Sequence, residues 1–264
     1  MKLSHRLLAF MMAMVVMVGC IAAGSWASAA PLPKEKEKEK EKEKEHEGKK
    51  VDSGSFGVFQ NGHRVGTETF SIYQTSNGSV IDSEFKTENA PISAVQTSEM
   101  QLTAAGDIRR YEWKELSPGK AESVVLPNDD FLTEKWRTGP EEKEHEQPYL
   151  LPLSTSILDD YFFIHREVLA WKFLGASCKQ DKGQVQCPLK QRAQFATMNP
   201  HQHSSAPLSA EFLGREKVSL KSGQQDLLKL ELKTEAGTWQ LWLDDQFKVM
   251  RMLVVGENTE VERD

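Results

Sequence analysis

Residues 56–87 decide the fold; they read FGVFQNGHRVGTETFSIYQTSNGSVIDSEFKT. Two Asn-Gly pairs, Asn61-Gly62 and Asn77-Gly78, separate runs rich in apolar and β-branched residues. Asn-Gly is the strongest two-residue hairpin signal, because both positions adopt positive φ at little cost. The stretch therefore predicts three consecutive antiparallel strands, at 56–60, 65–73 and 80–87.

The same alternation of short β-like runs and turn sequences continues along the chain. Glycine, serine, proline and aspartate, which favour turns, punctuate it at 105–107, 117–119, 221–223, 235–237 and 244–245. The runs between them predict further strands at 95–103, 108–116, 212–220, 227–234, 239–243 and 249–255. We expect roughly ten short strands in all, with the spacing of a meander.

One segment, 156–174, has helical periodicity instead. Its apolar residues recur every three or four positions, at Ile157, Tyr161, Ile164, Val168 and Trp171. Ser154, Thr155 or Ser156 would cap its start, and Asp159 and Asp160 suit a first turn. A helix this apolar is expected to be enclosed by sheet. The predicted fold is mainly β: an antiparallel open barrel or strongly curved sheet packed around one central amphipathic helix.

The segment 177–187 predicts a hairpin around Asp181-Lys182-Gly183. With a two-residue loop at 182–183, Cys178 faces Cys187 in a non-hydrogen-bonded pair, where side chains approach most closely. We therefore expect a Cys178–Cys187 disulfide. Its presence would fit an exported chain, and the absence of a C-x-x-C motif favours a structural role over a redox role.

Residues 1–29 predict a secretion signal. Lys2 and Arg6 precede an apolar run over 7–23, and Ala27-Ser28-Ala29 then forms an A-x-A site with cleavage between Ala29 and Ala30. A second interpretation is lipoprotein processing, because 18–20 resembles the end of a lipobox and would leave Cys20 acylated. A third is an uncleaved anchor, since the apolar run approaches the length that spans a bilayer.

A charged linker, 30–50, follows the signal. Lysine and glutamate alternate through it, so i,i+4 neighbours on a helix would repel, and it contains few apolar residues to bury. We expect a disordered spacer, followed by a single β-rich domain at 51–264. Loss of Lys2 and Arg6 with the signal changes the formal net charge from −6 to −8. A negative chain disfavours nucleic acid and anionic lipid head groups as partners.

His201 and His203 form an H-x-H pair, which on a strand would place both imidazoles on one side. The pair is a weak candidate for a metal site, with His145, His165 or Glu211 as further ligands. H-x-H alone is a weak signal, and the surrounding polar residues instead favour a solvated loop, or a binding loop without metal. No metal or other cofactor is therefore predicted.

The sequence carries no recognisable catalytic motif: G-x-S-x-G, S-x-x-K, H-E-x-x-H and the P-loop are all absent. Two paired acids, Asp159-Asp160 and Asp244-Asp245, lie at a predicted helix start and in a predicted turn, where aspartate has structural roles. Arg166 and Glu167 are expected at a solvated edge of the helix. No catalytic residue is predicted.

Three parts of the chain together resemble a known group of proteins. They are residues 57–70 (GVFQNGHRVGTETF), the predicted helix around Asp159-Asp160-Tyr161, and 211–253 with its FLGREKV and WLDDQFKV segments. The combination is similar to an uncharacterised family of exported bacterial β-rich proteins, which resemble the open barrels of lipoprotein carriers. The resemblance covers most of 55–255, but neither the linker nor the cysteine hairpin belongs to it. It implies a concave sheet able to shelter something apolar, and it carries over no functional residue.

Three functions are compatible with these observations. The first is an exported protein of the periplasm or cell envelope, non-catalytic, that binds or shields an apolar ligand such as a lipid; Cys20 would tether it to a membrane if acylated. The second is a structural or protein-interaction module without a small ligand. The third is a hydrolase or metalloenzyme that uses the loop of His201 and His203.

Overall fold

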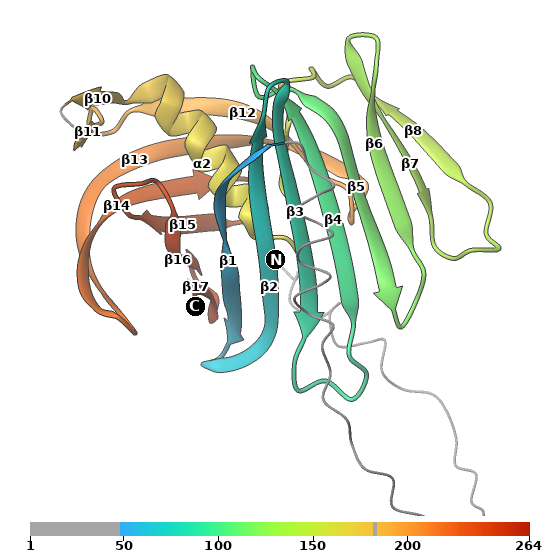
Figure 1. Cartoon of the computed structure of the whole chain (residues 1–264), viewed down its shortest axis with the longest axis horizontal. Helices are drawn as coiled ribbons and strands as arrows, with labels where there is room; N and C mark the ends of the chain where they lie inside the picture. The colour runs from blue at the N-terminus through green and yellow to red at the C-terminus, as the bar shows by residue number, and fades with distance from the viewer. Residues whose placement is uncertain (1–47, 182–183) are drawn as a thin grey trace, which may run out of the picture. The chain divides into compact units, whose positions relative to one another are not determined.

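The computed structural model describes residues 48–181 and 184–264 (Figure 1). Cys20, Ala29 and Ala30 and nearly all of the predicted linker lie outside these residues. The elements, labelled as in Figure 1, are β1 (Lys49–Gln60), β2 (His63–Thr75), β3 (Gly78–Thr87), β4 (Val95–Thr103), β5 (Ile108–Ser117), β6 (Glu122–Asn128), β7 (Phe131–Arg137), β8 (His145–Tyr149), β9 (Ser156–Ile157), α2 (Ile164–Ser177), β10 (Lys179–Asp181), β11 (Gln184–Gln186), β12 (Arg192–Asn199), β13 (Ser204–Leu220), β14 (Gly223–Lys233), β15 (Thr238–Leu243), β16 (Val249–Val254) and β17 (Thr259–Arg263).

Within the described residues, 15 strands form one sheet in the order β8-β7-β6-β5-β4-β3-β2-β1-β17-β16-β15-β14-β13-β12-β9. We call β1–β8 the N-terminal arm, and β12–β17 together with β9 the C-terminal arm. The first and last strands pair, with Val58 opposite Val261, so the two arms join in the middle of the sheet. All neighbouring strands are antiparallel except β9 and β12, which run parallel.

The sheet is large and curled, and it does not close, because its end strands β8 and β9 are not paired with each other. The predicted mainly-β fold is thus confirmed as a curled, predominantly antiparallel sheet; the parallel pair was not predicted. Each strand predicted from the sequence overlaps an observed one. The strands that the sequence did not reveal are β6–β9, β12 and β17, which are short or lack a clear apolar run.

The two Asn-Gly pairs differ in their geometry. Asn61 and Gly62 both have positive φ, 53° and 77°, and form the predicted hairpin turn between β1 and β2. At the second pair Gly78 is already opposite Thr75, as the first residue of β3. A Cβ atom on Gly78 would lie 1.9 Å from the carbonyl oxygen of Leu102. Glycine is required at position 78 by the close approach of a neighbouring strand.

The helix is shorter at its start than the sequence predicts. The prediction of helix over 156–163 is wrong, because Ser156-Ile157 pairs with β12 as strand β9. The carboxylate of Asp159 then accepts the backbone N–H of Tyr161, an alternative to helical hydrogen bonding. The helix α2 begins at Ile164 and continues to Ser177, beyond the predicted end.

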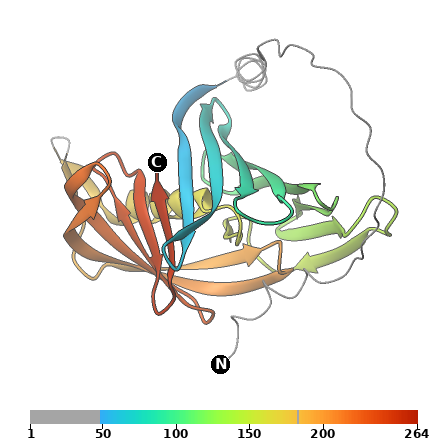
Figure 2. The ribbon, with the colours of Figure 1, turned by 90° about the horizontal axis from the view of Figure 1, so that it is seen from below.

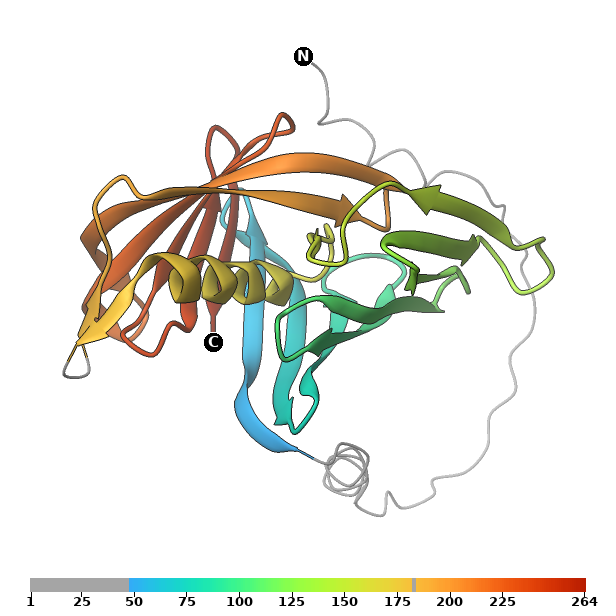
Figure 3. The ribbon, with the colours of Figure 1, turned by 90° about the horizontal axis from the view of Figure 1, so that it is seen from above.

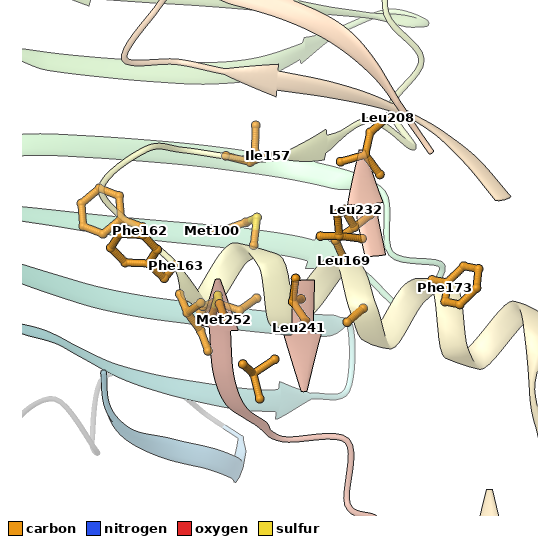
Figure 4. Close-up of a cluster of buried hydrophobic side chains, with 14 of the residues drawn as sticks. Met100, Ile157, Phe162, Phe163, Leu169, Phe173, Leu208, Leu232, Leu241 and Met252 are labelled. Atoms are coloured by element: carbon orange, nitrogen blue, oxygen red, sulfur yellow. The ribbon is translucent and has the colours of Figure 1, made fainter. Parts of the chain in front are cut away.

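Figures 2 and 3 show α2 on the concave side of the curled sheet, as expected for a central helix. Its apolar side chains join those of both arms in one core. Figure 4 shows part of this core, with Met100, Ile157, Phe162, Phe163, Leu169, Phe173, Leu208, Leu232, Leu241 and Met252 labelled. Among the described residues, no helix has the length and apolar character needed to span a membrane.

Arg166 and Glu167 are buried, so their predicted place at a solvated edge is wrong. Arg166 stacks over the ring of Trp239, 4.0 Å from its centroid, and Glu167 accepts hydrogen bonds from Arg263 and from the backbone N–H of Val249. Both residues face the sheet because the helix is enclosed and has little solvated face at this turn.

The predicted disulfide is present. Cys178 and Cys187 are bonded, with their Cα atoms 4.3 Å apart, directly after α2. In the β10–β11 hairpin Asp181 is opposite Gln184, the register expected for a two-residue loop. The alternation argument from the sequence therefore identified both the pair and the strand register.

Candidate functional site

The tip of the β12–β13 hairpin, residues 199–204, carries both histidines of the H-x-H pair. The side chain of Asn199 accepts the backbone N–H of His201, and His203 adopts a positive φ of 48°. This conformation is uncommon for a residue other than glycine. Figure 3 shows the hairpin reaching across to the N-terminal arm.

His201 lies between the two arms. Its ring stacks on Trp113 of β5, with centroids 3.8 Å apart, and its side chain is only 9% exposed. Nδ1 is 2.6 Å from a carboxylate oxygen of Asp159, and Nε2 is 2.9 Å from the amide oxygen of Gln96 on β4. The prediction of a solvated loop is therefore wrong for His201.

Asp159 is bonded to three groups in this region. Its buried carboxylate accepts the hydroxyl of Tyr111 and the backbone N–H of Tyr161 in addition to its contact with His201. Burial acts to raise the pKa of Asp159, but the adjacent His201 and these hydrogen bonds together lower it. Burial and the neighbouring Asp159 carboxylate raise the pKa of Tyr111 well above its usual value.

His203 repeats this arrangement further along the N-terminal arm. Its Nδ1 is 2.9 Å from a carboxylate oxygen of Glu134 on β7, and its ring stacks on Trp136 at 4.2 Å. Glu134 also accepts the hydroxyls of Ser123 and Tyr149. Burial raises the pKa of Glu134. The side chain of His203 is 31% exposed, so this pair lies nearer to solvent than the first.

These contacts define what we call the histidine–carboxylate cluster: His201, His203, Asp159, Glu134, Trp113 and Trp136. The two imidazoles contact different acids. In residues 48–181 and 184–264, no three His, Cys, Asp or Glu side chains are grouped so that they would hold a metal ion.

The other residues considered as ligands make different contacts. His145 stacks on Trp136, Glu211 pairs with Arg192, and His165 lies in the core beside Tyr111. Asp244 accepts backbone N–H groups from Gln246 and Lys248 in the turn after β15, which is the structural role expected for it.

His165 is a buried imidazole without a hydrogen bond to either ring nitrogen. Burial lowers its pKa to about 4. Two further polar atoms of this region, Nε1 of Trp113 and Oγ of Ser98, are also buried without a partner. Trp113 and Ser98 are directly opposite each other on β5 and β4, beneath the hairpin tip. These buried polar atoms beside the cluster have no hydrogen-bond partner among the described residues.

Glu68 of β2 lies at the start of α2. Its carboxylate accepts the backbone N–H groups of Phe163 and Ile164 and the hydroxyl of Ser83. Burial raises the pKa of Glu68 to about 7, although these hydrogen bonds oppose the shift. An acid from a distant strand therefore supplies the cap that the sequence around the helix start lacks.

The chemistry available to the cluster is limited. An acid that orients an imidazole is one part of a nucleophilic triad, and the other part is a hydroxyl or thiol beside the imidazole. Among the described side chains, neither His201 nor His203 forms a hydrogen bond with a serine, threonine or cysteine, and Gln96 contacts the second nitrogen of His201. The contacts observed for the two imidazoles are those that connect the hairpin tip to Asp159, Gln96 and Glu134.

Glu134, Gln96, Trp113 and Trp136 were not identified from the sequence. A local signal existed for two of them, because alternation in β7 puts Leu132, Glu134 and Trp136 on one face of the strand. An acid between two apolar residues on a core-facing side indicates a buried, paired carboxylate. No local signal identified His203 as its partner, which is 69 positions away.

Comparisons with known proteins support the fold alone. No protein-family model matches the chain, and no curated protein matches it. A β-barrel-like protein of a domain of unknown function, DUF1849, from Brucella abortus aligns with a TM-score of 0.50 and 8% identity, covering 80% of this chain and 94% of that one. A DUF1089 family protein from Pseudomonas aeruginosa aligns with a TM-score of 0.40 and 11% identity, and the alignment covers 72% of this chain and 90% of that one. The chain is thus similar in fold to a barrel-like β protein of unknown function; its export and its likeness to lipoprotein carriers stay predictions.

Proposed function

We propose that this protein is a non-catalytic structural or interaction module of the bacterial cell envelope. The observation that carries the proposal is that the chain's own helix fills the concave face of the sheet. In α2, the side chains of Ile164, Leu169 and Phe173 are at most 1% exposed and belong to the same core as both arms. With the helix in place, the surface available to a partner is then mainly the outside of the sheet and its ends.

The helix is fixed at several points along its length. Glu68 binds its first N–H groups, and Glu167 contacts Arg263 of β17. The indole N–H of Trp171 donates to the carbonyl oxygen of Phe247, and the disulfide follows its last turn. A helix held in this way is a permanent part of the core, which argues against a carrier whose ligand replaces it.

The proposed location rests on the signal-like residues 1–29 and on the Cys178–Cys187 disulfide, since disulfides persist in oxidising compartments. Cleavage after Ala29 would release a soluble protein, whereas acylation of Cys20 would tether it to a membrane. Intact mass measurement of protein purified from its own host distinguishes the two, because acylation adds a defined mass to an N-terminal cysteine.

Native mass spectrometry of the same preparation tests the proposed function. We expect the mass of the chain or of a protein complex, with no bound lipid. The control is the same sample after extraction with organic solvent and refolding. A stoichiometric lipid that is present before extraction and absent after it would overturn this proposal and support the apolar-ligand function.

The apolar-ligand function has one observation in its favour. At the start of α2, Phe85, Tyr161 and Phe163 form an aromatic group with ring centroids 5.9 and 6.4 Å apart, and Tyr161 is only half-buried. Aromatic rings near the surface are a common lining for apolar ligands. The lipid measurement above decides between the two functions.

A further inference from the structure

We propose that the tip of the β12–β13 hairpin, residues 199–204, is a releasable latch that holds the C-terminal arm against the N-terminal arm. The closed form is the one described above. In the released form the tip withdraws from β4, β5 and β7 while the rest of the sheet stays paired. This inference goes beyond the proposed function and does not depend on it.

The tip is attached to the N-terminal arm by side chains. His201 contacts Gln96 and Trp113, and His203 contacts Glu134. In the described part of the chain, no backbone hydrogen bond links residues 199–204 to the N-terminal arm. Where the arms meet at β1 and β17, in contrast, a backbone ladder runs from Phe56 to Gln60. The tip can therefore separate without breaking any strand pairing.

The closed form carries an unfavourable feature at the same place. Beneath the tip, Nε1 of Trp113 and Oγ of Ser98 are buried without hydrogen-bond partners. Withdrawal of the tip would let water reach these two groups. Stacking and the two acid–imidazole contacts oppose release.

Release would also change the surface of the protein. The ring of His201 covers Trp113, which is only 7% exposed, and lies 4.6 Å from the ring of Tyr161. Withdrawal of His201 would expose both aromatic rings together. The latch would therefore control access to an aromatic surface on the inner side of the N-terminal arm.

Hydroxyl-radical footprinting of the mature protein, read by mass spectrometry, tests the latch. Trp113 is compared with Trp242, which is 3% exposed in the small cluster on the opposite face of the sheet and away from the tip. We expect the oxidation rate of Trp113 to exceed that of Trp242 by more than the ratio of their exposed fractions in the closed form, 7% against 3%, because only Trp113 is exposed by release. A ratio of rates no larger than this ratio of exposed fractions would overturn the proposal.

A variant pair strengthens the test. His203→Ala removes one charge-assisted contact and is expected to raise oxidation of Trp113 about tenfold while Trp242 is unchanged. Arg215→Ala, which removes ion pairs to Asp226 and Asp245 elsewhere on the C-terminal arm, should leave both rates as they were. Should His203→Ala unfold the protein, both rates would rise together, and the comparison in the unaltered protein still decides the question.

Discussion

The carboxylate of Glu68 accepts the backbone N–H of Ile164, the first residue of α2, although the two residues are 96 positions apart. The contact orients the helix relative to β2 and so fixes how the concave face is filled. It also places an acid in the core, where burial disfavours its ionised form more than the surrounding hydrogen bonds and Arg166 favour it. The contact between strand and helix thus connects the architecture to a dependence of stability on pH.

Glu68→Gln is expected to change how stability varies with pH. The pKa of Glu68 is about 7 in the folded protein, raised by burial from 4.5, so between these values the folded state binds a proton that the unfolded state has lost. The contribution of the Glu68 carboxyl to the free energy of unfolding is therefore fully present below pH 4.5 and is lost as pH rises through 7. Glutamine mimics the protonated form, so the variant gains up to about 3 kcal/mol relative to the parent between pH 4.5 and 8.

Urea unfolding at several pH values measures this difference. Glu257→Gln, a substitution of an exposed acid in a turn, is the matched control and should follow the parent at every pH. If Glu68→Gln also runs parallel to the parent from pH 4.5 to 8, the carboxyl of Glu68 is not held in its neutral form and the argument fails.

His165→Leu tests the loss of stability that is expected as pH falls. Burial lowers the pKa of His165 from 6.5 to about 4. Between these two pH values the unfolded state therefore binds a proton that the folded state does not bind. Stability is therefore lost as pH falls from 6.5 to 4, by up to about 3 kcal/mol. Leucine removes this loss and leaves no unpartnered nitrogen. Thermal unfolding at pH 4.5 and 7.5 should show a smaller difference for the variant; His63→Leu, at an exposed site, should retain the full difference.

The Cys178–Cys187 bond should form in the purified, air-exposed mature protein, and thiol titration should find no free cysteine. Replacing both cysteines by alanine is expected to lower the free energy of unfolding by about 2–3 kcal/mol, the value for closing a short loop. A reducing agent should destabilise the parent by a similar amount and leave the double variant unchanged. Two titratable thiols in the native parent would contradict the prediction.

The sequence predicted those parts of the fold whose determinants are local. Asn61 and Gly62 form a turn because both residues adopt positive φ readily. The alternation of side chains between Cys178 and Cys187 determines which residues of the hairpin face each other. In both cases the interacting residues are fewer than ten positions apart. The pairing of Val58 with Val261 cannot be predicted from local patterns, because any apolar strand can pair with any other.

The candidate site was harder to predict for the same reason. His201 was singled out as a loop residue, yet its partners come from β4, from β5 and from the segment before α2. Asp159 was assigned to a helix start because its local sequence suits one, and tertiary contacts overrode that preference. Polar residues that bond across a fold show no periodicity, so the sequence indicates at most that they are unusual where they occur.

Arg263 should be far more important for stability than Arg215, although each makes two ion pairs. Arg263 is 10% exposed and bonds to Asp52 and Glu167, which are at most 1% exposed, whereas Arg215 and its partners lie at the surface. Arg263→Gln leaves Glu167 buried without its cation and leaves Asp52 with Lys248 alone, and it should cost about 3–5 kcal/mol. Arg215→Gln should cost about 0–1 kcal/mol. Urea unfolding of both variants at pH 7 gives the comparison; equal losses would mean that the Arg263 pairs are as hydrated as a surface bridge.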